Sequence, residues 1–393
     1  MRNERAVTRW TPGIVLLFAA LLAAILLAAT PAAGRGWLAM LVLLDLRGND
    51  SSLLQDLRPE PLRSNAEIPG PDRPIQADHY LPADRPARAT LVLLHGFAPQ
   101  GRREPRLMAL ATTLARAGVA VLVPELDGMR SLGVGTEDVS DIAATLRHAL
   151  AGEEDRTGKQ LAHCRPVGLM AFSFAVGPAL LAALTPEVRE RLDFVVAVGG
   201  YYDLEAAITY ATTGYDPLSG RRGAPPAPEG RWWLLQSQAD RLATPTDRAA
   251  MAEIARRRLA DPDAAVDDLL PQLGPGGRVL YGLTANTDPA RVPALLAALP
   301  DDARRPLESL DLKTRNPQDL AAPLVLIHGI HDRMIPISHS RALLAHLGAE
   351  RARLFEVPGL QHVDIGSSPA TAWQLWRAVV HLLTLTGAER PSC

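Results

Sequence analysis

The stretch from Val167 to Leu184 constrains the fold of this chain more than any other. It opens with a short, continuously apolar run that predicts a buried strand, and it ends with an apolar segment long enough for a helix. Between the two lies Ala171-Phe172-Ser173-Phe174-Ala175. A tight turn from strand to helix would place Ser173 at its tip. This arrangement is typical of a nucleophile elbow, in which a strained turn exposes the hydroxyl and the following N–H points at the same spot.

The predicted turn departs from the usual G-x-S-x-G pattern. Ala171 and Ala175 replace the two glycines, and alanine is still small enough where the strand and helix backbones nearly touch, although it does not tolerate positive φ. Pro178 would forfeit one hydrogen bond if the helix began at Phe174. Taken alone, the stretch also fits an ordinary buried strand and helix in which a serine caps the helix.

Composition excludes several classes of protein. A chain of 393 residues has room for one large α/β domain with an elaboration, or for two domains. The formal net charge is −2 and there is no basic run with interleaved aromatic residues, so no nucleic-acid partner is predicted. The two cysteines, Cys164 and Cys393, cannot form a disulfide framework, and neither has metal-ligating neighbours at close spacing. No metal site is therefore predicted.

The N-terminus contains an unbroken apolar run from Gly13 to Ala29. At the helical rise this run spans about 26 Å, just short of a typical hydrocarbon core, and we interpret it as an uncleaved transmembrane helix. A cleaved signal peptide is the competing interpretation, because small residues follow the run. The run exceeds the usual apolar length of about 7–15 residues in signal peptides, and Pro31 disfavours cleavage after Thr30.

The arginines around this run predict its orientation. Arg2, Arg5 and Arg9 precede the run, whereas only Arg35 and Arg47 follow it closely, so the positive-inside bias places the rest of the chain on the non-cytoplasmic side. Secretion after cleavage and a cytoplasmic-facing domain remain the alternatives. A second apolar run, Trp37–Leu44, is too short to cross a membrane. It would either lie along the interface, with Trp37 at headgroup level, or pack on the domain as a helix.

Apolar runs alternate with amphipathic segments along much of the chain. This alternation predicts βαβ units and therefore an α/β fold with a mostly parallel central sheet and helices on both faces. Ligands of such sheets bind at the carboxyl ends of the strands, where Ser173 would lie. The expected strands are Ile75–Leu81, Ala89–Leu94, Val119–Val123, Val167–Met170, Phe194–Val198, Leu324–Ile327 and Arg353–Val357, and the expected helices are Glu104–Ala117, Glu137–Leu150, Ser338–Leu347 and Pro369–Leu385.

The segment His95-Gly96-Phe97-Ala98 follows one of these strands directly. A strand that ends in His-Gly before a loop and a helix resembles the oxyanion loop of the α/β-hydrolase superfamily. The resemblance implies that the backbone N–H of Phe97 or Ala98, together with that of Phe174, would hold the oxygen of a tetrahedral intermediate. His95 is expected to brace this loop rather than to act as the general base.

Two later loops extend the resemblance. Asp332 lies three residues after Gly329 and is followed by Ile335-Pro336, which resembles the family's acid loop, although a turn or capping aspartate would fit too. His362 lies in a short loop between the last strand and the C-terminal helix, as the family's catalytic histidine does. The order Ser173, Asp332, His362 is the superfamily's nucleophile, acid and base order, so the resemblance implies a catalytic triad. Asp203, after the preceding strand, is the rival acid.

Between Gly200 and Leu324 the alternation fails. Short amphipathic segments around Arg231–Leu242, Asp247–Leu259 and Ala290–Leu299 are separated by joints rich in proline and glycine. In the family, this connection commonly grows into a helical cap over the active site. An independent small domain is the alternative, but the helices look too short and their apolar stripes too thin to bury a core alone. Trp232 and Trp233 are expected either to line an acyl pocket or to pack within the cap.

These observations predict the domain organisation. Residues 1–45 would form the membrane anchor or signal peptide with an interfacial segment, and residues 46–73, rich in Pro, Arg, Asp and Ser, a linker. Residues 74–200 and 322–388 would form the hydrolase core, and residues 201–321 the helical cap.

The resemblance also implies an activity. It implies a serine hydrolase that forms an acyl-enzyme without a metal or organic cofactor, most simply a carboxylic-ester hydrolase of the esterase or lipase kind acting on a small-molecule acyl substrate. A serine at the elbow argues against the dehalogenases and epoxide hydrolases of the superfamily, which use an aspartate there. The alternatives are a serine peptidase, an acyltransferase, and a non-catalytic, membrane-tethered binding protein on a hydrolase scaffold.

Overall fold

The computed structural model describes residues 30–48, 52–133, 135–152, 165–362, 364–366 and 368–387. The apolar run Gly13–Ala29 lies outside the described residues, and with it the prediction of a transmembrane helix. Cys164 and Cys393 lie outside them as well. Among the helices of the described ranges, none is long and apolar enough to cross a membrane.

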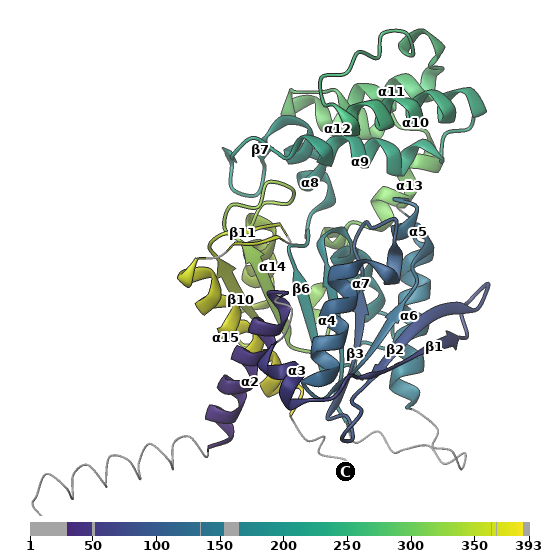
Figure 1. Cartoon of the computed structure of the whole chain (residues 1–393). Helices are drawn as coiled ribbons and strands as arrows, with labels where there is room; N and C mark the ends of the chain where they lie inside the picture. Colours follow the sequence, from purple (N-terminus) through teal and green to yellow (C-terminus); the bar gives the residue numbers. More distant parts are fainter. Residues whose placement is uncertain are drawn as a thin grey trace, which may run out of the picture.

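An eight-stranded sheet organises the molecule (Figure 1), and seven of its strands were predicted from the alternating pattern. The strand order is β1-β2-β4-β3-β5-β6-β9-β10. β2 pairs antiparallel with β1 and with β4, and every other pairing is parallel, so the prediction of a mostly parallel sheet is confirmed. The strands are β1 (Leu62–Ile68), β2 (Ile75–Leu81), β3 (Ala89–Leu94), β4 (Val119–Pro124), β5 (Val167–Phe172), β6 (Phe194–Val198), β9 (Leu324–Gly329) and β10 (Ala352–Val357).

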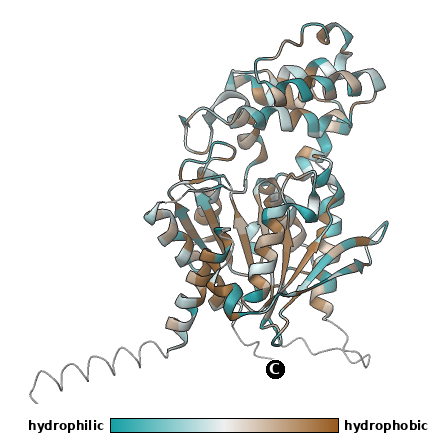
Figure 2. Ribbon diagram, in the orientation of Figure 1, coloured by the Kyte–Doolittle hydropathy of each residue, from teal (hydrophilic) through white to brown (hydrophobic). Residues whose placement is uncertain are grey.

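Helices cover both faces of this sheet. Successive side chains of a strand point to opposite faces, and in β3 Val92 and Leu94 belong to one apolar cluster whereas Leu91 and Leu93 belong to another. The buried strands are accordingly apolar on both sides and appear brown in the centre of Figure 2. α6 (Glu137–Ala151), α7 (Val176–Ala183) and α14 (Ser338–Leu347) pack on the first face, and α4 (Pro105–Arg116) and α15 (Pro369–Leu385) on the second.

The stretch predicted to be a linker contains two elements that the sequence did not indicate. These are α3 (Leu53–Leu57) and β1, the edge strand of the sheet. Within β1 only Ile68 is buried, so the strand lacks the alternation that reveals a half-buried strand. Its backbone pairs with β2 along its whole length. Pairing rather than side-chain burial therefore holds this edge in place.

The run Trp37–Leu44 lies within α2 (Pro31–Leu46), a helix that packs on the domain. Its inner side buries Ala39, Leu41 and Val42, and its neighbours are α15, α3 and α4. Of the two interpretations of this run, the structure thus shows the helix that packs on the domain.

Helices fill the insertion between β6 and β9, which stands beyond the carboxyl ends of the parallel strands at the top of Figure 1. Three of them, α9 (Pro228–Ala239), α10 (Pro245–Ala260) and α12 (Val292–Ala297), coincide with the expected segments. The others, α8 (Leu204–Thr213), α11 (Pro275–Thr284) and α13 (Asp301–Ser309), were not predicted. The remaining short elements are α5 (Asp127–Arg130), β7 (Tyr215–Asp216), β8 (Arg221–Arg222), β11 (Leu360–Gln361) and β12 (Asp364–Ile365).

The insertion shares its apolar interior with the main core. Leu235, Met251, Ile254 and Leu280 are all fully buried, and they belong to the same apolar cluster as one face of the sheet. Trp232 is buried too, with the guanidinium of Arg258 5.3 Å from its ring centroid, so it packs between α9 and α10. These apolar side chains continue into the main core instead of forming a separate one.

Candidate active site

A strained turn connects β5 to α7. β5 ends at Phe172, residues Ser173–Ala175 form one turn of 3-10 helix, and α7 starts at Val176. Ser173 has φ 56°, in the left-handed region that costs energy for any residue with a side chain. Ala171 and Ala175 are almost fully buried and have no positive φ, so alanine is compatible with both positions.

Pro178 does not weaken the helix after this turn. Because α7 starts at Val176 and not at Phe174, Pro178 lies in the first helical turn. The N–H groups of the first turn have no partner inside the helix, so a proline there removes no hydrogen bond. The expected loss rested on a helix start two residues too early.

The structure brings the three residues of the predicted triad together. The Ser173 hydroxyl lies 2.6 Å from Nε2 of His362, and Nδ1 of His362 lies 2.9 Å from Oδ2 of Asp332. Ser173 lies on the elbow, Asp332 follows β9, and His362 follows the short strand β11. A histidine hydrogen-bonded to a hydroxyl on one side and to a buried carboxylate on the other can take up the hydroxyl proton.

The surroundings of Asp332 keep its carboxylate ionised. Burial by itself would raise the pKa of Asp332, but hydrogen bonds from His328 and His362 more than offset this effect and lower the pKa below its usual value. Its Oδ1 accepts hydrogen bonds from the backbone N–H of Met334 at 2.8 Å and of Ile335 at 3.1 Å. The Asp332 carboxylate is therefore fixed in position as well as in charge.

A second histidine, His328, lies next to Asp332 and was not predicted from the sequence. His328 is fully buried, and its Nε2 donates to the carbonyl of Ile335 at 2.8 Å while lying 3.5 Å from Oδ2 of Asp332. Its Nδ1 accepts a hydrogen bond from the Ser340 hydroxyl at 2.7 Å. The only available signal was a histidine at the end of an apolar strand, four residues before the aspartate.

Asp203, the rival acid, is engaged elsewhere. Its side chain caps α8 by accepting a hydrogen bond from the N–H of Ala206 at 2.8 Å, and it pairs with Nζ of Lys313 at 2.8 Å. The neighbouring Tyr201 hydroxyl donates to the carbonyl of Leu310 at 2.9 Å. Asp203 therefore helps to join the two chain segments that lead into and out of the insertion.

His95 fixes the loop that was expected to form the oxyanion hole. Its Nδ1 donates to the carbonyl of Gly96 at 2.8 Å, and its Nε2 accepts a hydrogen bond from the N–H of Leu126 at 3.2 Å. Burial lowers the pKa of His95, which favours the neutral form that this pattern requires. Because the C=O and N–H of a trans peptide point in opposite directions, holding Gly96 O turns the N–H of Phe97 away from His95.

The same loop lies against the elbow. A Cβ atom placed on Gly96 would be 3.5 Å from Cβ of Ser173, so the two backbones are nearly in contact. Side by side, the rings of Phe97 and Phe174 stack with centroids 4.8 Å apart and an interplanar angle of 13°. Within the described part of the chain, the backbone N–H groups of Phe97, Ala98 and Phe174 form no hydrogen bond. They are therefore available as donors, and Phe174 follows Ser173 directly in the chain.

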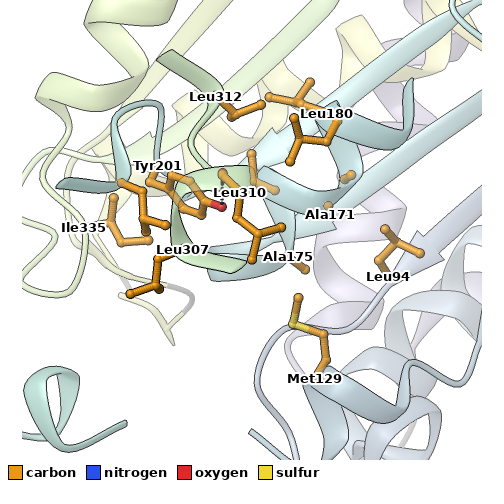
Figure 3. Close-up of a cluster of buried hydrophobic side chains, with 14 of the residues drawn as sticks. Leu94, Met129, Ala171, Ala175, Leu180, Tyr201, Leu307, Leu310, Leu312 and Ile335 are labelled. Atoms are coloured by element: carbon orange, nitrogen blue, oxygen red, sulfur yellow. Dashed lines mark hydrogen bonds between the residues drawn. The ribbon is translucent and has the colours of Figure 1, made fainter. Parts of the chain in front are cut away.

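Apolar side chains from the core and the insertion meet around Ala171 and Ala175, which lie two residues before and after Ser173 (Figure 3). Ala171, Ala175 and Leu94 come from the core, whereas Leu307 and Leu310 belong to the segment that leaves the insertion. The described residues contain no group of three or more His, Cys, Asp or Glu side chains that could hold a metal ion.

The sheet order, the elbow at the end of β5 and the hydrogen-bonded Ser173, His362 and Asp332 define an α/β-hydrolase fold with a hydrolase-like site. In agreement with this class, the model of the alpha/beta hydrolase family matches residues 91–373. The chain belongs to that family.

Solved structures similar to this chain include two esterases and a peptidase. One is a ligand-bound form of the rice cell wall degrading esterase LipA from Xanthomonas oryzae, with 14% identity and a TM-score of 0.47 over 82% of this chain and 88% of that one. Another is the Pyrococcus furiosus esterase PF2001, with 12% identity and a TM-score of 0.45 over 87% and 96%. An acylaminoacyl peptidase in complex with Z-Gly-Gly-Phe-chloromethyl ketone has 13% identity and a TM-score of 0.46 over 84% of this chain. The chain spans 43% of the length of that peptidase.

Proposed function

We propose that this protein is a serine hydrolase that works through an acyl-enzyme. The observation that carries the proposal is the continuous pair of hydrogen bonds from Ser173 Oγ to His362 and from His362 to Asp332, 2.6 Å and 2.9 Å long. These two linked hydrogen bonds have little structural purpose on a strained turn, whereas they are the arrangement that activates a serine.

The mechanism follows from the positions of these groups. His362 Nε2 takes the Ser173 proton as Oγ attacks the carbonyl carbon, and the ionised Asp332 stabilises the imidazolium that forms. The carbonyl oxygen becomes an oxyanion, for which the free N–H groups of Phe97 or Ala98 and of Phe174 are the donors. His362 then protonates the leaving group. Water attacks the acyl-enzyme in the second half of the reaction, with His362 as base again.

A carboxylic ester of a small or medium acyl group is the substrate class that we propose. The stacked rings of Phe97 and Phe174 beside Ser173 offer an apolar surface to the group next to the scissile carbonyl. A peptidase would use the same machinery on an amide, and an acyltransferase would replace water by an alcohol as acceptor.

A panel of substrates tests this proposal. p-Nitrophenyl esters of increasing acyl length and peptidyl p-nitroanilides are compared with wild-type protein and Ser173→Ala. We expect ester turnover by the wild type, much slower anilide turnover, and neither with Ser173→Ala. Faster anilide than ester turnover would identify a peptidase, and a new ester formed from added alcohol would identify a transferase. A wild type that acts on none of these while folded would favour the binding-protein alternative.

For location, we propose an N-terminal membrane anchor, Gly13–Ala29, with the catalytic domain on the non-cytoplasmic side. The proposal is supported by the length of this apolar run and by the three arginines before it. The full chain should remain in the membrane fraction after a carbonate wash. The mass of the isolated protein should show that its N-terminus has not been cleaved. Loss of roughly 30 residues from the mature protein would instead show a cleaved signal peptide.

A further inference from the structure

The large apolar side chains that the structure leaves exposed gather in one part of the molecule. In the described ranges there are seven of them, between 38% and 61% exposed. Contiguous exposed apolar surface on a soluble domain marks an interaction site, whereas scattered single residues do not. Leu62 opens β1, and the other six define what we call the N-terminal apolar face: Trp37, Met40 and Leu44 of α2, Leu53 and Leu57 of α3, and Trp373 of α15.

α2 is held firmly against the domain, so this exposure does not come from a loose helix. The side opposite Trp37, Met40 and Leu44 is buried, and Asp45 at the end of the helix is buried with it. The Asp45 carboxylate accepts hydrogen bonds from Nε2 of Gln55 at 2.9 Å and from the hydroxyl of Thr113 in α4. The three exposed side chains, at positions i, i+3 and i+7, share one side of a fixed helix.

Trp373 joins the surface of α2 through a second tryptophan. Nε1 of Trp376 donates to the carbonyl of Gly36 at 2.8 Å, and the Trp376 ring stacks on Trp373 with centroids 4.9 Å apart. A Cβ atom on Gly36 would lie 3.1 Å from the Trp376 ring, so a glycine is needed for this close approach. The start of α15 and the first half of α2 therefore present one continuous surface.

The sequence before α2 indicates what covers this surface. The apolar run Gly13–Ala29 ends directly before Thr30, the N-cap of α2, so the chain reaches the N-terminal apolar face from its most apolar segment. Tryptophan is enriched at the membrane interface, and an apolar helix side with polar surroundings buries itself at the headgroup boundary. We propose that the N-terminal apolar face docks on the interfacial region of a lipid bilayer.

This docking would orient the whole molecule. α2 begins at the bottom of Figure 1, whereas the insertion lies at the top, and the carboxyl ends of the parallel strands point toward the insertion. The part of the face that lies on α2 is therefore on the side of the molecule away from the insertion. The proposal adds a second, peripheral contact to the proposed anchor, and a flexible tether without it would leave the orientation of the domain free.

Tryptophan quenching tests the docking directly. The full chain with Trp10→Phe is bound to phosphatidylcholine vesicles, with or without bromine on the acyl chains close to the headgroups, because bromine quenches only tryptophans that it nearly touches. In this background we compare Trp37→Phe/Trp373→Phe with Trp233→Phe, a half-buried tryptophan of the insertion. Phenylalanine keeps the surfaces apolar. We expect the pair of substitutions to remove most of the quenched intensity and Trp233→Phe to leave it unchanged.

Flotation of the vesicles separates docking from anchoring. Protein that floats with the vesicles but whose quenching survives Trp37→Phe/Trp373→Phe would overturn the docking proposal and leave the anchor standing. Protein that does not float would overturn both. A dimer in detergent that Leu44→Asp dissociates would overturn the proposal as well, because a second copy would then occupy the face.

Discussion

Asp332 and Asp203 are the same type of residue, but their positions in the fold give them different partners. Both Asp332 and Asp203 follow a strand of the sheet, and the sequence offered each as the acid of the site. Asp332 meets His362 and two backbone N–H groups, whereas Asp203 caps α8 and pairs with Lys313. Their environments, and not their residue type, assign the proposed role to Asp332.

Asp332→Asn should therefore lower kcat/KM for an ester by roughly three to four orders of magnitude. An amide cannot stabilise the imidazolium and can hold His362 in the wrong tautomer. Asp203→Asn is the control, and we expect it to retain activity within a small factor because its side chain does not touch His362. The reverse pattern in steady-state kinetics would show that Asp203 is the acid.

Asp138 provides a prediction on stability. It is buried in the first turn of α6, its Oδ2 has no hydrogen-bond partner, and burial raises its pKa to about 7. The folded state thus binds this proton more tightly than the unfolded state, so the free energy of unfolding should fall as the pH rises from about 4 to 7. This pH-dependent decrease in the free energy of unfolding is on the order of a few kcal/mol, and Asp138→Asn should remove it. Urea unfolding at several pH values measures it, and parallel profiles for both proteins would contradict it.

Among the helices and strands, the sequence predicted those whose burial produces a recognisable pattern of apolar residues. The parallel strands are covered on both faces, so they were visible as continuous apolar runs. β1 was missed because an exposed edge strand is held by backbone pairing, and α13 because it contains Pro306, which usually ends a helix. The order of the site residues was readable, but the partners of His328 and His95 were not, since they depend on how the segments after β9 and β4 lie against these two histidines.

The packing of α7 against the insertion gives a test at this level. A Cβ atom on Gly177 would lie 1.9 Å from the hydroxyl of Tyr201. This hydroxyl donates a hydrogen bond to the carbonyl of Leu310. Gly177→Ala should therefore push Tyr201 from its place, cost about 1–3 kcal/mol of unfolding free energy, and lower ester turnover. Gly34→Ala, in a position with no neighbour within 4 Å, is the matched control. Equal stability of the two variants would show that the contact is not tight.

For the whole molecule, the position of the N-terminal apolar face predicts where the substrate comes from. If this face docks on a bilayer with the start of α2 next to the membrane, the insertion that stands over the carboxyl ends of the strands points into the aqueous phase (Figure 1). Vesicle-bound protein should then hydrolyse a short-chain, water-soluble ester at the rate of the detergent-solubilised protein. It should leave an ester embedded in the same vesicles nearly untouched. Preferential turnover of the embedded ester would contradict this orientation.

The central claim is that Ser173 is an activated nucleophile, and labelling with a fluorophosphonate probe tests it most directly. The reagent needs an activated serine and makes no demand on the natural substrate. We predict that the wild-type protein is labelled at Ser173, as located by peptide mass spectrometry, and that Ser173→Ala and His362→Ala are not labelled although both remain folded. A folded wild-type protein that stays unlabelled, or that carries the label on another residue, would contradict the claim.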